Sequence, residues 1–229
     1  MSLQGRLLGR PIAHRGLWRT GGPPENSLAA FEATCAAGYG IELDVRLTAD
    51  GEAVVFHDET LERITSESGL TEERTLDELT ALRLLGSDQQ VPTLEQTLAL
   101  IGGRVVVLVE LKTPPGQEGA LEARVAALLT AYAGPCGVLS FNPDALACIA
   151  LHGPGLARGL NARTEQALDT LPASKAHFLS VSQELAGHER AQDIRGSGRA
   201  VIAWTIRNRA EWDRAGPLVD NLIFEGFTP

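Results

Sequence analysis

Short apolar runs alternate with amphipathic stretches along almost the whole chain. The runs have the length of buried strands, and the stretches that follow them repeat apolar residues at helical spacing. Such alternation predicts repeated strand and helix units around a parallel sheet. Eight strands are expected, and they end near Ala13, Arg46, Leu111, Phe141, Asn161, Ser182, Thr205 and Glu225.

Seven amphipathic stretches lie between these strands, and several open with residues that favour helix starts. Ser27 follows Pro-Glu-Asn, Thr93 follows a proline, and Asn142 precedes one. Seven helices that join eight strands indicate a (β/α)8 barrel, and 229 residues suit one such domain. The expected helices span residues 27–37, 93–101, 119–132, 143–151, 163–170, 185–195 and 207–215.

One segment departs from this alternation. Residues 41–47 and 53–57 are strand-like runs around Asp50-Gly51, which predicts a β-hairpin that returns the chain to the barrel mouth. Residues 59–91 then form a polar excursion longer than an ordinary loop, with one helical stretch over residues 75–84. We therefore expect a single domain over residues 1–229, with the excursion as a small insertion over the site.

The formal net charge of −9 disfavours a nucleic-acid partner, because affinity for the phosphate backbone depends on lysine and arginine. Cys35, Cys136 and Cys148 lack CxxC spacing, which argues against a disulfide framework and against structural zinc. No apolar run approaches the roughly 18 residues that cross a bilayer, and the opening segment has no long apolar stretch. We expect a cytoplasmic protein without stable membrane insertion, of undetermined oligomeric state.

Charged residues that end apolar runs are the candidates for chemistry, because active groups of a parallel barrel lie at the carboxyl ends of its strands. Strand alternation places Glu42, Asp44 and Arg46 on one face. Two carboxylates so close repel each other unless a cation lies between them. Either a bound metal or a salt bridge to Arg46 would satisfy them.

The most apolar run of the chain, residues 105–109, ends in Glu110 and Lys112. Burying either charge unpaired is costly, so each needs a partner at the barrel mouth. Glu110 either completes a three-carboxylate site suited to Mg2+ or Ca2+, with Lys112 facing a phosphate, or simply pairs with Lys112.

Two histidines stand at the ends of predicted strands. His14 belongs to His-Arg-Gly on the first strand, and His57 to Phe-His-Asp at the end of the hairpin. Each motif is weak alone, but together they supply two imidazoles, the side chains best suited to acid and base catalysis near neutral pH. The other histidines, at predicted helices or strand starts, are expected to be structural: His152, His177 and His188.

The ordered set of motifs resembles the glycerophosphodiester phosphodiesterase family, within the phospholipase C-like phosphodiesterases. The resemblance spans nearly the whole chain, and the order and spacing of the motifs make it specific. The motifs are His14-Arg15-Gly16, Pro24-Glu25-Asn26-Ser27, Glu42-Leu-Asp44-Val45, Phe56-His57-Asp58, Pro92-Thr93-Leu94-Glu95, Glu110-Leu-Lys112, Ser140-Phe141-Asn142 and Trp204-Thr205.

The resemblance implies a (β/α)8 barrel that hydrolyses glycerophosphodiesters to glycerol 3-phosphate and an alcohol such as choline or ethanolamine. It implies a divalent cation, Mg2+, Ca2+ or Mn2+, held by Glu42, Asp44 and Glu110, with His14 and His57 as the acid and base. Water or the neighbouring glycerol hydroxyl remain alternative nucleophiles. Further matches imply phosphate contacts from Arg15 and Lys112, apolar substrate contacts from Phe141 and Trp204, and support from Glu25 and Asn26.

The last predicted strand departs from the family pattern. Family members commonly carry an Ile-Ile-Thr-Asp-like run before a proline near the end, whereas this chain reads Asn221-Leu-Ile-Phe-Glu225-Gly. We expect an altered substrate pocket, with the metal and acid-base positions untouched.

Three alternatives stay open. A related barrel acting on lysophospholipids or phosphoinositides would need an apolar entrance, and aromatic residues make up only 5% of the chain. A non-catalytic barrel that binds glycerophosphodiesters or metal would be favoured by loss of a histidine or carboxylate, and none is lost. A purely structural role gives no reason for charges at the ends of the most apolar strands.

Overall fold

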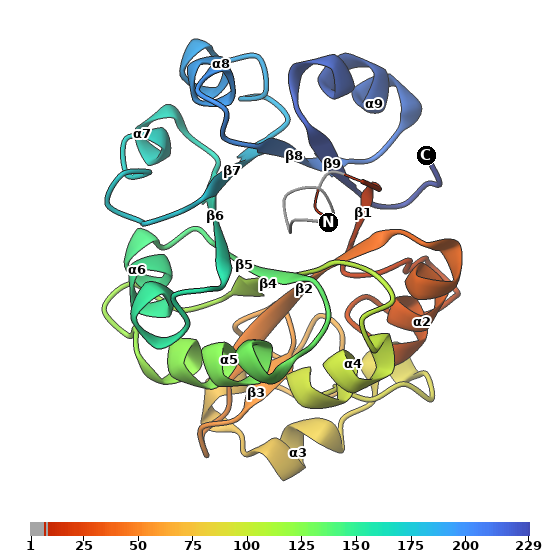
Figure 1. Cartoon of the computed structure of the whole chain (residues 1–229). Coiled ribbons are helices and arrows are strands. Elements are labelled where there is room, and N and C mark those ends of the chain that lie inside the picture. The colour runs from red at the N-terminus through yellow and green to blue at the C-terminus, as the bar shows by residue number, and fades with distance from the viewer. Residues whose placement is uncertain (1–6, 8) are drawn as a thin grey trace.

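The computed structural model describes residue 7 and residues 9–229. Eight parallel strands close into a barrel with helices on its outside (Figure 1), which confirms the predicted (β/α)8 fold. The expectation that the opening segment has no long apolar stretch rests partly on residues 1–6. These residues lie outside the described part of the chain. The barrel strands are β1 (Ile12–His14), β2 (Gly40–Leu47), β4 (Val107–Leu111), β5 (Cys136–Ser140), β6 (Ala157–Ala162), β7 (Phe178–Ser182), β8 (Val201–Ile206) and β9 (Asn221–Phe224).

The barrel closes through β1, which pairs with β2 on one side and β9 on the other. The register sets His14 opposite Glu42, and on the next pair of strands it sets Asp44 opposite Glu110. Side chains at the same level of neighbouring strands lie next to each other in the interior. The pairing therefore gathers residues from distant parts of the sequence at one level of the barrel.

The helices begin close to the residues expected from the sequence. Ser27, Thr93 and Asn142 are N-caps whose side chains accept hydrogen bonds from first-turn amides. The helix expected over 185–195 begins later, because His188 is extended and serves as its N-cap. The helices are α2 (Leu28–Ala37), α4 (Leu94–Ile101), α5 (Ala120–Ala131), α6 (Pro143–His152), α7 (Glu165–Leu168), α8 (Glu189–Gly196) and α9 (Arg209–Ala215).

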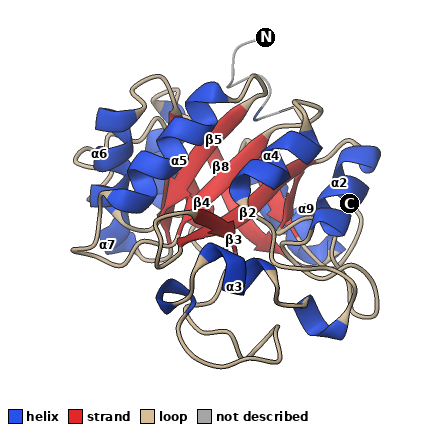
Figure 2. Cartoon of the chain, turned by 90° about the horizontal axis from the view of Figure 1, so that it is seen from below, coloured by secondary structure: helices blue, strands red, loops and turns tan. Residues whose placement is uncertain are grey.

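The excursion forms a small insertion at one end of the barrel. Strand β3 (Ala53–Val55) runs antiparallel to β2, which confirms the hairpin. Helix α3 (Leu76–Thr80) is shorter than the stretch expected over 75–84, because Arg83 turns into an antiparallel bridge with Gln90. The insertion buries its own apolar cluster, and Figure 2 shows helix α3 beyond β3, at one end of the barrel.

The interior of the barrel is divided along its axis. Apolar side chains that include Ile12, Leu108 and Phe178 fill the end where the strands begin. Gly159 on β6 makes room for the Phe178 ring, since a Cβ there would lie 2.2 Å from it. The other end of the interior contains buried carboxylates instead, among them Asp44. Chemistry is thereby confined to the carboxyl ends of the strands, as in other parallel barrels.

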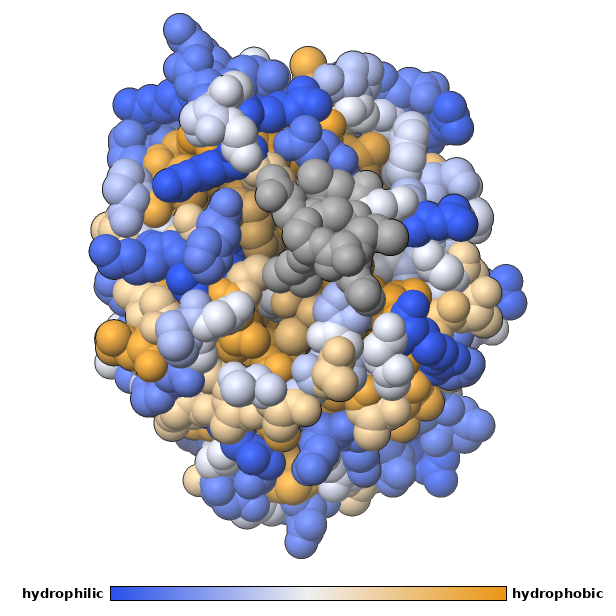
Figure 3. Space-filling view, in the orientation of Figure 1, coloured by the Kyte–Doolittle hydropathy of each residue, from blue (hydrophilic) through white to orange (hydrophobic). Residues whose placement is uncertain are grey.

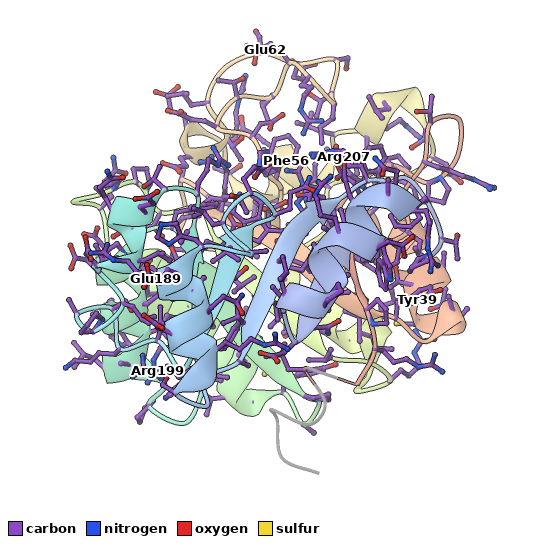
Figure 4. The ribbon with its side chains drawn as sticks, turned by 90° about the horizontal axis from the view of Figure 1, so that it is seen from above. Tyr39, Phe56, Glu62, Glu189, Arg199 and Arg207 are labelled. Carbon is purple, nitrogen blue, oxygen red and sulfur yellow. The ribbon has the colours of Figure 1, made fainter. Side chains whose placement is uncertain are left out.

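Figure 4 shows the direction of the strands. Arg199 precedes β8 and Arg207 follows it, and the two lie at opposite ends of the barrel, with the insertion loop that carries Glu62 beyond the Arg207 end. Figure 3 shows the face seen in Figure 1, where hydrophilic side chains gather along the upper rim and hydrophobic ones are frequent in the lower half. Within the described part of the chain, no helix combines the length and apolar character that a membrane span requires.

Candidate active site

A cavity of about 240 Å3 opens at the carboxyl ends of the barrel strands. A larger groove of about 590 Å3, which His152 lines, contains no carboxylate, lysine or arginine, so size alone does not locate the chemistry. The small cavity brings together eight of the residues that the sequence singled out: His14, Arg15, Glu42, His57, Glu110, Lys112, Phe141 and Trp204.

Three carboxylates form the centre of the site. One oxygen each of Glu42, Asp44 and Glu110 lies within 4.8 Å of the others, and all three side chains are buried. Oε1 of Glu42 has no hydrogen-bond donor among the described residues, and neither has Oδ1 of the neighbouring Asn161. Buried oxygens without donors are costly, and hard divalent cations prefer oxygen ligands of this kind. The cluster therefore fits a divalent cation.

The electrostatics of the three carboxyl groups differ. Burial raises the pKa of Glu42, and the charges of Asp44 and Glu110 raise it further. Burial also raises the pKa of Glu110, although Lys112 opposes this effect. Burial acts in the same direction on Asp44, but Lys112 and Arg15 outweigh it and hold the pKa of Asp44 below its ordinary range. A bound cation would favour the ionised form of all three groups.

Two partly buried cations contact this cluster. Nζ of Lys112 lies 2.9 Å from Oδ1 of Asp44 and also binds Glu110. Nε of Arg15 lies 3.1 Å from Oδ2 of Asp44. Burial lowers the pKa of each base, but the surrounding carboxylates raise it more, so both stay charged. The simple pair of Glu110 with Lys112 thus exists, within a larger ionic network.

Arg46 takes no part in this network. Its Nε donates to the backbone oxygen of His57 at 3.0 Å, and its Nη1 donates to Glu72 in the insertion at 3.0 Å. The alternative in which Arg46 neutralises Glu42 and Asp44 is therefore wrong. Arg46 pairs with Val54 of β3 and its side chain reaches Glu72, so it supports the hairpin and the insertion instead.

Glu25 and Asn26 lie behind the cluster. Nδ2 of Asn26 donates to Oδ2 of Asp44 at 2.9 Å, and Oε1 of Glu25 accepts from Arg15 at 2.8 Å. Arg15 and Asn26 both adopt left-handed backbone conformations, with φ of 59° and 55°. Such conformations persist at sites where the surroundings enforce them. Glu25 also accepts two hydrogen bonds from Arg63, which joins the insertion to the site.

Each candidate acid-base histidine presents its Nδ1 to a carboxylate. Nδ1 of His57 lies 2.6 Å from Oδ1 of Asp58. Burial lowers the pKa of His57, and the neighbouring Lys112 adds to this, while Asp44 opposes it. Nδ1 of His14 lies 2.6 Å from Oε2 of Glu225. Nε2 of His14 lies 3.8 Å from Oε2 of Glu42, beyond hydrogen-bond distance.

Glu225 corrects an expectation from the sequence. The departure in the last strand was expected to leave the acid-base positions untouched, and this is wrong, because Glu225 contacts His14 directly. Burial alone raises the pKa of Glu225, but the hydrogen bond with His14 and the charges of His14 and Arg207 lower it more. Phe224 lies buried, so the register of β9 directs the next side chain to the site.

Two aromatic rings line the cavity wall. Phe141 and Trp204 pack edge to face with their centroids 5.5 Å apart. The guanidinium carbon of Arg163 lies 5.2 Å from the Phe141 centroid and 5.5 Å from the Trp204 centroid. These distances suit cation-π contacts.

Sequence reasoning missed four residues of the site: Arg163, Arg207, Arg63 and Asn161. Asn161 ends a predicted strand, and its Nδ2 donates to Glu110 at 3.0 Å.

The remaining histidines lie outside the cavity lining. His177 contacts Arg158 at the start of β7, and His152 ends α6. His188 caps α8, where its Nδ1 accepts from the amide of Arg190 at 3.3 Å. These contacts agree with the structural roles that the sequence predicts for them.

The sequence of residues 14–223 matches the glycerophosphoryl diester phosphodiesterase family. YhdW of Bacillus subtilis is 30% identical over 213 residues, which cover 86% of each chain. The glycerophosphodiester phosphodiesterase of B. subtilis is 28% identical over 233 residues, 89% of this chain and 78% of the relative.

Solved structures agree with the sequence comparison. A phosphodiesterase from Oleispira antarctica, in complex with the product sn-glycerol-3-phosphate, superposes with a TM-score of 0.85 at 28% identity. The match covers 94% of this chain and 92% of that one. The match of residues 14–223 contains the three carboxylates and the two histidines of the cavity. The chain therefore belongs to the glycerophosphoryl diester phosphodiesterase family, whose members are phosphoric diester hydrolases.

Proposed function

We propose that this protein is a divalent-metal-dependent enzyme that hydrolyses glycerophosphodiesters to sn-glycerol 3-phosphate and an alcohol, with His14 and His57 as acid and base. The observation that carries the proposal is the cluster of three buried carboxylates within 4.8 Å of one another, beside two histidines in one cavity. The product complex of the Oleispira antarctica relative supports the choice of substrate class.

Glu42, Asp44 and Glu110 would hold the cation. The donor set consists of carboxylate oxygens and includes the unpartnered Oε1 of Glu42, which fits Mg2+, Ca2+ or Mn2+ better than a thiophilic metal. A bound divalent cation would supply positive charge against the phosphate oxygens as negative charge develops there.

Arg15 and Lys112 supply further positive charge. Both are charged side chains that line the cavity and are held in place by Asp44. Preorganised cations stabilise the charge that develops on a phosphoryl group without reorganisation during the reaction. We assign both residues to the non-bridging phosphate oxygens.

The two histidines would divide the proton transfers. One imidazole takes a proton from the attacking hydroxyl or water, and the other gives a proton to the oxygen of the leaving alcohol. Both rings line the cavity and are anchored through Nδ1, which leaves Nε2 as the atom for each transfer.

The leaving alcohol would occupy a second groove of about 510 Å3, which shares His57, Lys112, Phe141 and Arg163 with the cavity. Aromatic faces recognise quaternary ammonium groups, but here the guanidinium of Arg163 already lies over both rings. A cationic alcohol would meet a like charge at that place. We therefore propose neutral or anionic alcohols as the preferred leaving groups over choline.

The setting of the enzyme is also a proposal. The three cysteines are free thiols in the described structure, as suits a reducing compartment. We propose a single-domain cytoplasmic enzyme that takes a small-molecule substrate, with no nucleic-acid partner.

The test starts from chelated protein. Release of glycerol 3-phosphate is assayed from glycerophosphoglycerol, glycerophosphocholine and glycerophosphoethanolamine with each divalent cation added back, and His14→Ala serves as the inactive control. Activity that returns with metal and is absent from the variant supports the proposal. If folded protein releases no glycerol 3-phosphate with any cation, the proposed activity is wrong. Lysophospholipids and phosphoinositides then become the next substrates to assay.

A further inference from the structure

The hydrogen bond between His14 and Glu225 joins the first barrel strand to the end of the last one. The two residues are 211 positions apart, and they meet because β1 pairs with β9, with Ala13 opposite Phe224. Nδ1 of His14 lies 2.6 Å from Oε2 of Glu225. The side chain of Glu225 is only 13% exposed, so water competes little for this contact.

The chemistry of the pair fixes which nitrogen carries the proton. An ionised carboxylate only accepts hydrogen bonds, so Nδ1 of His14 must be the donor. In the neutral ring, Nε2 then has the free lone pair. That atom lies 3.8 Å from Oε2 of Glu42 and therefore faces the carboxylate cluster. The hydrogen bond thus sets both the tautomer and the direction of the nitrogen that would exchange a proton.

Glu225 is itself held from two sides. Its Oε1 lies 2.7 Å from Nε of Arg207, and its backbone amide donates to the carbonyl of Ile206 at 2.9 Å. Both partners belong to the end of β8, so Glu225 is tied to the adjacent strand while it holds His14. An anchored carboxylate restricts the imidazole more than a mobile one would.

We propose that Glu225 is a positioning residue for catalysis: it holds His14 in the tautomer and orientation that proton transfer requires. The proposal rests on the assignment of His14 as an acid-base residue. It adds to the two histidines a residue that directly follows the last strand. His57 has an equivalent partner in Asp58, which is supplied by the adjacent position in the sequence.

The kinetic test compares three substitutions at Glu225. Glu225→Ala removes the acceptor, and we expect kcat to fall about 10-fold to 100-fold, as for other carboxylates that orient a functional histidine, with KM changed less than about 2-fold. Glu225→Gln keeps an acceptor oxygen and should retain more activity than alanine. Glu225→Asp is shorter by one methylene and should lie between alanine and wild type. The control is Glu32→Gln on the outer helix α2. It removes a carboxylate that pairs with Arg104.

The second readout is the tautomer itself. Long-range 1H–15N NMR of the imidazole nitrogens, assigned with His14→Gln, should show a proton on Nδ1 of His14 in wild type and its loss in Glu225→Ala. Metal affinity by calorimetry should stay within about 3-fold of wild type. Unchanged kcat, an unchanged tautomer, or a loss of activity that tracks a loss of metal affinity would each overturn the proposal. Wild-type protein without any diesterase activity would refute the proposed function instead, while the NMR comparison still tests the contact.

Discussion

The substitution Glu42→Gln should make the protein more stable than wild type without metal and less stable than wild type with saturating metal. In chelator the three carboxylates lie within 4.8 Å of one another without a divalent cation. Two unit charges at 4.8 Å repel by about 3.5 kcal/mol at an effective dielectric constant of 20. Lys112, Arg15 and a retained proton relieve part of this cost, because burial and the neighbouring carboxylates raise the pKa of Glu42.

Glutamine has the shape of glutamate without its charge, so it removes the repulsion that remains at position 42. We expect Glu42→Gln to raise the free energy of unfolding of the metal-free protein by about 1 to 3 kcal/mol, which is part of the repulsion of about 3.5 kcal/mol between two charges at this distance. For a chain of this length, that corresponds to about 2 to 12 °C in Tm.

Metal should stabilise wild type more than it stabilises the variant. A cation at 100 times its Kd stabilises wild type by about 2.7 kcal/mol. The variant lacks one of three proposed ligands and should gain much less at the same concentration. Thermal unfolding followed by circular dichroism, in chelator and in excess Mg2+, measures both effects, with Glu32→Gln as the matched surface control. A variant that is less stable than wild type in chelator and gains equally from metal would refute this account of the cluster.

Three further predictions address separate parts of the site. His57→Gln should lower kcat about 10^2-fold to 10^4-fold with metal affinity retained, and near-normal turnover would remove His57 from proton transfer. Arg163→Gln should raise kcat/KM for glycerophosphocholine relative to glycerophosphoglycerol about 2-fold to 5-fold, since it frees two aromatic faces and a cation-π contact at an exposed site is worth about 0.5 to 1 kcal/mol, and an unchanged ratio would exclude Arg163 from selectivity. Burial raises the pKa of Glu25, but Arg63 and Arg15 lower it more, so its stabilising effect is present above its unfolded pKa and is lost as pH falls. In urea unfolding at acid pH, the free energy of unfolding of Glu25→Gln should therefore depend less on pH than that of wild type. An equal slope of this free energy against pH in both proteins would contradict the prediction.

The sequence predicts the strands well because each is a short apolar run that ends in a polar residue. Strand alternation also predicts the cluster, since Glu42 and Asp44 are two positions apart and share the interior face. Helix starts follow from capping side chains such as Ser27 and Thr93. These features are local, so a single segment contains the information that specifies them.

The contacts that the sequence did not reveal depend on tertiary structure. The partner of His14 is fixed by the register between β1 and β9, which no local pattern specifies. Arg63 reaches Glu25 from the insertion, and Arg163 lies over rings that come from two other strands. Each of these residues is an ordinary charged side chain in its own segment. Only the folded barrel distinguishes them from other surface arginines and glutamates.

The closure of the barrel through β1 and β9 has a consequence for protein synthesis. His14 is made early and Glu225 is made 211 residues later, which at about 5 to 20 residues per second takes about 10 to 40 seconds on the ribosome. During that interval β1 lacks one of its two neighbouring strands, so its edge stays unpaired. A nascent or truncated chain can already contain every proposed metal ligand while the proposed acid-base site is still incomplete. Hydrolysis would thus depend on synthesis of β9 and Glu225, and fragments that end before this strand would lack the contact that holds His14.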